Sequence, residues 1–371
     1  MGHYNRIGHL AAFPELYLRR RSKSNAPLRE KHVFVCGHPA NRQMLTMIQR
    51  QMTVIENEFF VTLYHQLHSL KPQSRLWVDL PKIQDSYEDS YEDFTNISPQ
   101  MSFTPKEEEQ GAQLLNQMGL KTGTPFVCLH VRDGRYLEKM QPSIDWSYHN
   151  YRDCHIENYY AAIEYLTSLG IYVLRMGQVF NQDLGIHDPL LIDYAKKFRS
   201  DFGDVYLSAK CSFFIASEGG LNSVAWTFNV PVVYTNGIPP VTAVGWRKED
   251  IFIHKKLWSI NEQRFLSYRE IIDRGIDRWV CSQNYQEAGI DVIENSPEEI
   301  LGAVKEMALQ LKGEWLEKEE DKVLRERYRG LIPDHHRRKN FLSKIGIDFL
   351  NANKKLLERH SVQLHKSTPD F

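Results

Sequence analysis

The feature that most constrains the fold is a regular alternation of short apolar runs and helical patterns after residue 124. Each apolar run is rich in β-branched and aromatic residues, and the segments between the runs carry apolar residues at helical spacing. Strands that are apolar throughout are buried on both faces, which is typical of parallel sheets covered by helices. The sequence therefore predicts a parallel, doubly wound sheet with strands at 126–129, 171–174, 205–207, 213–216 and 231–234.

Polar and glycine residues follow three of these strands directly. In an open α/β sheet, ligands bind beyond the carboxyl ends of the strands, so these residues are expected at one shared edge. The alternative is an ordinary surface turn after each strand. The candidates are His130, Arg132, Asp133 and Arg135 after the first strand, Arg175 and Gly177 after the second, and Ser217, Glu218, Gly219 and Gly220 after the fourth.

This set of residues suits a diphosphate. The glycine pair allows a ligand to approach the backbone. The helix predicted at 221–228, with Asn222 and Ser223 in its first turn, offers free N–H groups. The three arginines can neutralise phosphate, and Glu218 can accept hydrogen bonds from sugar hydroxyls, although each arginine could instead form a surface ion pair. No D-x-D triplet occurs in the chain, so we expect no metal and no other cofactor.

Candidates for a catalytic base come from both halves of the chain. His9 can accept a proton near neutral pH, and Glu15 and Asp133 are the carboxylate alternatives. His9 could equally be a packed residue at a helix end. A polar and aromatic cluster, Tyr148, His149 and Arg152, is a candidate for contact with the acceptor or with a nucleobase, or else a plain loop.

Composition restricts the class of protein. A formal charge of −1 and a pI near 7.0 argue against a nucleic-acid partner, and five widely spaced cysteines argue against a disulfide framework. Without a signal-peptide pattern or a long apolar segment, a cytoplasmic protein is expected. The basic residues Arg19, Arg20, Arg21 and Lys23 could contact anionic lipid at the inner membrane, or form a solvated helix end.

At 371 residues the chain is expected to form two domains. Thr104, Pro105 and Glu107 predict a capped helix that connects them. The predicted organisation is an N-terminal α/β domain at 1–104, a connector at 105–123, a nucleotide-sugar-binding α/β domain at 124–312 and a helical tail at 313–371. The repeated Ser-Tyr-Glu-Asp at 86–93 is expected to be an unstructured acidic loop, or alternatively a flap that contacts the acceptor.

Three features together resemble GT-B glycosyltransferases. They are the two-domain α/β body, the connecting helix that begins Thr-Pro and leads into the strand ending in His130-x-Arg132, and the Gly-Gly turn before Pro231. The chain is most similar to a bacterial group of glycosyltransferases from surface-polysaccharide loci, in the segments RIGHL, HVRD, YRDCHIENYYAAIEYLTSLGIYVLRMG, FFIASEGG and ENSPEEI. His130-x-Arg132 is similar to the fucosyltransferase motif whose arginine binds the donor diphosphate, although Arg135 stands where that motif has an aspartate. Gly8-His9 lies where heptosyltransferases have Gly-Asp, with the aspartate as base.

The resemblance implies two Rossmann-like domains facing a cleft, with a C-terminal helical extension. It also implies a metal-independent, inverting transfer of a hexosyl or deoxyhexosyl group from a nucleoside diphosphate sugar to a glycan or lipid-linked acceptor. A nucleotide-sugar epimerase of the same fold and a non-catalytic glycan-binding protein are the alternatives.

Overall fold

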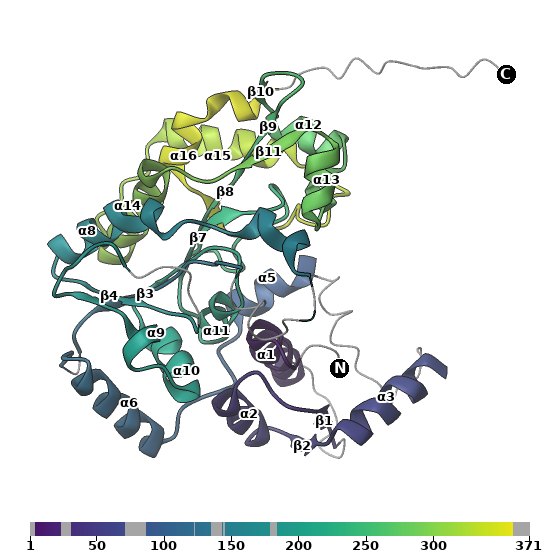
Figure 1. The fold of residues 1–371 in the computed structure, drawn as a ribbon, viewed down its shortest axis with the longest axis vertical. Coiled ribbons are helices and arrows are strands. Elements are labelled where there is room, and N and C mark those ends of the chain that lie inside the picture. The colour runs from purple at the N-terminus through teal and green to yellow at the C-terminus, as the bar shows by residue number, and fades with distance from the viewer. Residues whose placement is uncertain are drawn as a thin grey trace.

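A seven-stranded parallel sheet is the centre of the molecule in the computed structural model, which describes residues 4–23, 31–70, 87–121, 123–134, 143, 145–178 and 184–358 (Figure 1). The strand order is β12-β8-β7-β6-β3-β4-β5, and every neighbouring pair is parallel. The α/β class is thereby confirmed. The strands are β3 (Phe126–His130), β4 (Tyr172–Arg175), β5 (Leu191–Ile192), β6 (Phe214–Ala216), β7 (Val232–Gly237), β8 (Ile251–His254) and β12 (Lys344–Ile345).

The order of the strands reverses between β3 and β6. From β3 the chain first moves outward to β4 and β5, and then returns to build β6, β7 and β8 on the other side. Phe126 to Leu129 of β3 are buried, as expected for a strand covered by helices on both faces. Because the helices on the two sides of such a reversal lie on opposite faces, the loops at the ends of β3 and β6 diverge and leave a crevice there.

Two pairs of helices cover the sheet. α8 (Tyr160–Ser168) contacts α14 (Pro297–Lys312) on one face, and α10 (Asp201–Lys210) contacts α11 (Leu221–Thr227) on the other (Figure 1). α14 begins with a capping box between Ser296 and Glu299 and ends at Gly313 in the left-handed conformation.

The N-terminal residues form a smaller unit with a two-stranded parallel sheet, β1 (Val33–Cys36) with β2 (Thr53–Glu56). Its helices are α1 (Ile7–Lys23), α2 (Arg42–Gln49), α3 (Glu58–Leu70) and α5 (Tyr87–Asn96), and α6 (Pro105–Gln117) leads from it into β3. α6 carries the expected capping box of Thr104 and Glu107.

The remaining elements lie around these two sheets. None of the helices in the described ranges is long and apolar enough to cross a bilayer. The elements are η1 (Ser147–Arg152), η2 (Ile156–Tyr159), α9 (Tyr194–Lys197), β9 (Lys256–Ser259), β10 (Arg264–Phe265), α12 (Tyr268–Asp273), η3 (Ile276–Arg278), α13 (Ser282–Glu287), β11 (Ile290–Ile293), α15 (Glu319–Leu331), α16 (Ile347–Ala352) and η4 (Lys354–Leu357), with β10-β9-β11 as a third, antiparallel sheet.

Several local expectations were wrong. Residues 205–207 lie in α10, not in a strand, because the capping residue Ser200 starts a helix that continues through them. Residues 87–93 of the acidic repeat are not a loop, since α5 begins at Tyr87 and buries Phe94. The tail after residue 313 is not helical throughout, because β12 forms an edge of the large sheet.

Two arginines of the basic run near the end of α1, Arg19 and Arg20, form ion pairs within the protein. Arg19 is buried, and its guanidinium pairs with Glu15 at 2.7 Å and donates to the Thr227 carbonyl at 2.8 Å. Arg20 pairs with Asp93 at 2.7 Å. Arg19 therefore joins α1 to the C-terminal end of α11 and does not belong to a solvent-facing basic surface.

Candidate functional site

The ends of β3 and β6 lie side by side at the reversal of the strand order. The Arg132 amide donates to Ser217 Oγ at 2.8 Å, and the Ser217 amide donates to the His130 carbonyl at 3.1 Å. These bonds continue the β3–β6 ladder into the two loops. The structure thus brings together His130, Arg132 and the Ser217–Gly220 turn, as the sequence predicts.

Gly219 lies directly against the His130 ring. A Cβ built on Gly219 would be 2.7 Å from His130 Cε1 and 2.9 Å from Nδ1. Since no real Cβ contact is that short, only glycine allows the turn and the imidazole to stay in these positions. We refer to His130, Ser217, Glu218 and Gly219 as the β3–β6 wall.

We expect Gly219→Ala to displace either His130 or the turn. The cost should be about 1–3 kcal/mol of stability, as for other overpacking substitutions, together with a loss of activity. Thermal unfolding and turnover are the measurements. Gly330→Ala is the matched control, because a Cβ at this exposed helical position meets nothing within 4 Å. Equal behaviour of the two variants would contradict the close approach of Gly219 and His130.

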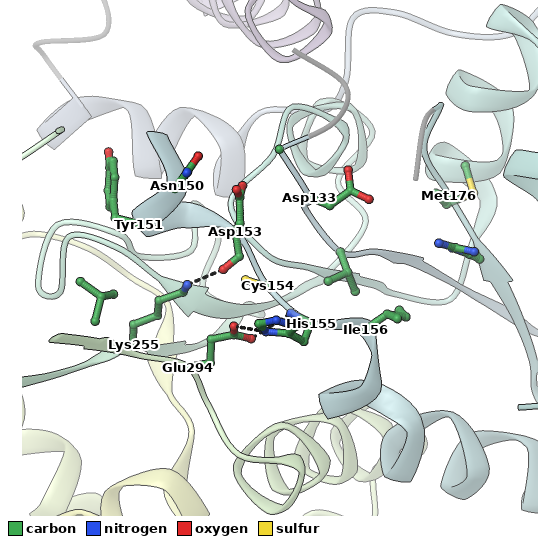
Figure 2. Close-up of a pocket in the computed structure, with 14 residues that line it drawn as sticks. Asp133, Asn150, Tyr151, Asp153, Cys154, His155, Ile156, Met176, Lys255 and Glu294 are labelled. Carbon is green, nitrogen blue, oxygen red and sulfur yellow. Dashed lines mark hydrogen bonds and ion pairs between the residues drawn. The ribbon is translucent and has the colours of Figure 1, made fainter. Parts of the chain in front are cut away.

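The segment from Arg152 to His155 crosses the sheet edge beside the β3–β6 wall (Figure 2). The Cys154 amide donates to the Arg132 carbonyl at 2.9 Å, and Arg132 Nε pairs with Asp153 Oδ1 at 3.2 Å. Arg152 pairs with Glu218 at 2.9 Å, so this segment is fixed to both β3 and β6.

A cavity of about 600 Å³ opens between this segment and the strand ends. Its walls come from the ends of β3, β4, β8 and β11 and from the crossing segment. Figure 2 shows Lys255 bonded to Asp153, and His155 bonded to Glu294. The lining residues are Val131, Asp133, Gly134, Asn150, Tyr151, Asp153, Cys154, His155, Ile156, Arg175, Met176, Lys255, Val292 and Glu294.

Two buried basic side chains, Lys255 and Arg175, line this larger cavity together with the carboxylates of Asp133, Asp153 and Glu294. Lys255 is only 3% exposed, and its ammonium donates to the Asp153 carbonyl at 2.6 Å. Within the described ranges no carboxylate is close enough to Lys255 to form an ion pair. Arg175 is also buried and lies 3.4 Å from Asp193, a long separation for an ion pair. A buried ammonium without a paired carboxylate favours an anion in the cavity.

His130 is held neutral by this environment. Burial lowers its pKa to about 4, and the nearby positive charges of Arg132 and Arg175 act in the same direction. Its Nδ1 is buried without a hydrogen-bond partner among the described residues, on the side where Gly219 lies. At neutral pH the ring is therefore an uncharged imidazole between the arginines.

A second, smaller cavity of about 250 Å³ lies against Glu218 and Gly219 of the β3–β6 wall, between α1, α11 and the turn after β7. Aromatic rings form much of it, and His9 stacks on Phe13 with ring centroids 4.9 Å apart. The lining residues are Gly8, His9, Ala12, Phe13, Glu218, Gly219, Asn222, Ser223, Trp226, Tyr234, Ile238, Pro239, Thr242, Ala243, Val244, Trp246 and Arg338.

The predicted site residues are thus divided between two cavities. Asp133 and Arg175 line the larger one, whereas His9, Glu218, Gly219, Asn222 and Ser223 line the smaller one. Gly177 follows β4 with a φ of +127°, a conformation that favours glycine. Gly220 contacts Gly8 of α1, and Arg135 lies outside the described residues.

Two residues of η1, Asn150 and Tyr151, line the larger cavity, whereas Tyr148, His149 and Arg152 line neither cavity. Tyr148 and His149 have ring centroids 3.9 Å apart, and Arg152 is engaged with Glu218. Burial lowers the pKa of His149 to about 4, with further lowering by Arg152, Arg132 and Arg6. Arginines from three separate segments therefore lie near this ring.

Glu15 is not placed to act as a base. Its carboxylate is fully buried, pairs with Arg19 and accepts from the Gln100 amide at 2.8 Å. Burial raises its pKa, while Arg19 opposes the rise. The Glu15 carboxylate is paired with Arg19 inside the protein. His9 and Asp133 remain as the proposed bases.

Two charged lining residues, Lys255 and Glu294, were missed by the sequence reasoning. Lys255 follows β8, a short strand that was not predicted, although its Ile-Phe-Ile-His pattern could have been recognised. Glu294 follows β11 in the same way, and its carboxylate accepts from the His155 ring at 2.6 Å.

Comparisons with known proteins give partial likenesses. No protein-family profile and no curated protein matches the chain. Solved structures with some likeness are a glycosyl transferase family 9 protein from Veillonella parvula DSM 2008 (14% identity, TM-score 0.35, 57% of this chain and 53% of that one) and E. coli ADP-heptose lps heptosyltransferase II (16%, 0.35, 57% and 54%).

A third is the dodecameric iron-containing heptosyltransferase TibC in complex with ADP-D-beta-D-heptose (21% identity, TM-score 0.21, 33% of this chain and 30% of that one). The chain spans about half the length of the first two structures.

Proposed function

We propose that this protein is a glycosyltransferase that binds a nucleoside diphosphate sugar in the larger cavity. The observation that carries the proposal is Lys255, a buried ammonium that lines this cavity and has a backbone carbonyl as its partner. Together with Arg132 and Arg175 it would compensate the charge of a diphosphate at the switch point of the sheet, where α/β folds bind such ligands. The acceptor would be a glycan or a lipid-linked saccharide of a surface polysaccharide.

The transfer follows from the chemistry of these groups. An acceptor hydroxyl attacks the anomeric carbon of the donor, and its proton passes to the base. His9 is the proposed base, with Asp133 as the alternative. The bond between the anomeric carbon and the diphosphate oxygen breaks, and the diphosphate leaves with the electron pair. Attack from the face opposite the leaving group inverts the anomeric centre. Arg132, Arg175 and Lys255 would stabilise the charge that develops on the leaving group.

A nucleotide screen tests this proposal. The matching member of a panel of UDP, GDP, CDP, CMP, dTDP and ADP should raise the free energy of unfolding by about 2.7 kcal/mol at 100 times its dissociation constant. Lys255→Met should remove this stabilisation, and Lys210→Met should keep it, because Lys210 pairs with Glu108 on α6, away from both cavities. Thermal unfolding is the measurement.

The outcomes separate the candidate functions. Lack of stabilisation by every nucleotide would favour a non-catalytic glycan-binding protein. Conversion of a donor sugar into its epimer without an acceptor would favour an epimerase. Stabilisation that survives in Lys255→Met would remove the larger cavity as the donor site.

A further inference from the structure

We infer that the smaller cavity is the acceptor site and that it binds an uncharged saccharide ring. This inference rests on the proposed function and names the class of acceptor. It is argued from polar groups in this cavity that the protein itself leaves unused.

Asn222 provides the first observation. The residue is 3% exposed, and its Oδ1 accepts from the Ser223 amide at 2.9 Å. Asn222 lines the cavity, and the described residues offer its Nδ2 no acceptor. This amide group can therefore donate to an acceptor atom of a ligand.

Ser223 and Glu218 add a hydroxyl and a carboxylate to the same cavity lining. Ser223 is 9% exposed and also lines the cavity, and the described residues offer its hydroxyl no hydrogen bond. Glu218 uses Oε2 for Arg152, which leaves Oε1 able to accept. The cavity therefore presents a donor, an acceptor and a hydroxyl that can do both.

This combination of groups suits sugar hydroxyls. A hydroxyl both donates and accepts, so a vicinal pair can bond Glu218 and Asn222 together. A phosphate in the same place would bring its negative charge against the Glu218 carboxylate. The smaller cavity carries one cation, Arg338, and one carboxylate, Glu218, in its lining. The larger cavity is lined by Arg175 and Lys255 together with the carboxylates of Asp133, Asp153 and Glu294.

The apolar part of the cavity suits the faces of a sugar ring. Phe13, Trp226, Tyr234 and Trp246 contribute to the lining, and Trp226 and Trp246 stack with centroids 4.4 Å apart. Asp250 accepts from Trp226 Nε1 at 2.7 Å and from the Trp246 amide at 2.8 Å, which fixes both residues. A preformed site with aromatic walls and few polar groups is typical of small-molecule binding.

The experiment measures saccharide binding directly. Methyl glycosides of neutral hexoses, 6-deoxyhexoses and N-acetylhexosamines are titrated into the full-length protein by ligand-detected NMR, with and without the nucleotide that stabilises it. At least one glycoside should bind, and nucleosides should not displace it.

Two near-isosteric variants test the location. Asn222→Asp keeps the acceptor for the Ser223 amide and replaces only the cavity-facing donor, and Glu218→Gln removes the carboxylate charge. Each should weaken glycoside binding at least tenfold. Asn222→Asp should leave nucleotide stabilisation unchanged, whereas Glu218→Gln also loses the charge that pairs with Arg152 beside the larger cavity. Asn116→Asp, at an exposed position of α6, is the control and should bind as the wild type does.

The results distinguish this inference from the proposed function. If nucleotides stabilise the protein but glycosides do not bind, or bind Asn222→Asp equally well, the acceptor assignment is wrong and the donor assignment stands. Displacement of the glycoside by a nucleoside would make the smaller cavity a nucleobase site. If no nucleotide binds while the glycoside does, the donor proposal fails, and the saccharide site remains.

Discussion

Arg132→Ala should lower the rate of sugar transfer by on the order of 10²–10³, the usual effect of removing one group that stabilises developing negative charge. Arg132 follows β3 at the switch point, and its guanidinium is held by Asp153 at 3.2 Å beside the larger cavity. Burial and the neighbouring Arg152 lower its pKa, so an anionic leaving group would be favoured at this position. Steady-state kinetics with the donor identified in the nucleotide screen is the measurement.

Arg50→Ala is the control for Arg132→Ala. Arg50 is also a partly exposed arginine in an ion pair, with Glu107 at 2.8 Å, but it lies on the connector side of the molecule. Its removal should leave turnover unchanged within a factor of two or so, since such pairs contribute little. Unchanged turnover in Arg132→Ala would exclude this arginine from the proposed donor site.

Arg19→Met should lower the free energy of unfolding by about 3–5 kcal/mol, the range for breaking one partner of a buried ion pair. The guanidinium is completely buried and satisfies Glu15, the Phe94 carbonyl at 3.1 Å and the Thr227 carbonyl at 2.8 Å. Methionine fills similar space but leaves the Glu15 carboxylate without its counter-charge. Chemical unfolding is the measurement, with Arg20→Met as a partly exposed comparison that should cost about 0–1 kcal/mol.

A double-mutant cycle separates charge from packing at this position. Glu15→Gln combined with Arg19→Met removes both charges. The double variant should therefore lose less free energy of unfolding than the two single variants lose in sum. Strict additivity would show that Arg19 acts through its other hydrogen bonds and not through Glu15.

The topology of the site could be predicted from the sequence because it follows from local patterns. Apolar runs without alternation indicate a parallel sheet, and a doubly wound sheet brings strand ends together whatever the side chains are. His130 and Gly219 were therefore found as neighbours. Lys255 was missed because β8 is only four residues long and is followed by further strand residues without a turn signal.

Features that depend on tertiary packing could not be predicted in this way. Glu15 looks like a free carboxylate in the sequence, and only the fold places it beside Arg19 in a fully buried position. The Arg19 four residues later was a signal for an ion pair, but not for its burial. The division of the site into two cavities follows from the packing of α1 on α11, which no local pattern specifies.

The contact between α1 and α11 has a consequence for how the smaller cavity could diversify. A Cβ on Gly8 would lie 3.0 Å from Gly220 Cα, and one on Gly220 would lie 3.0 Å from the Gly8 amide nitrogen. These two residues act as a spacer that sets the distance between the helices. A larger residue at either position would widen the gap between His9 and Glu218 while every polar lining residue stayed the same. Proteins of this architecture could thus accept bulkier ligands through a change in backbone separation alone.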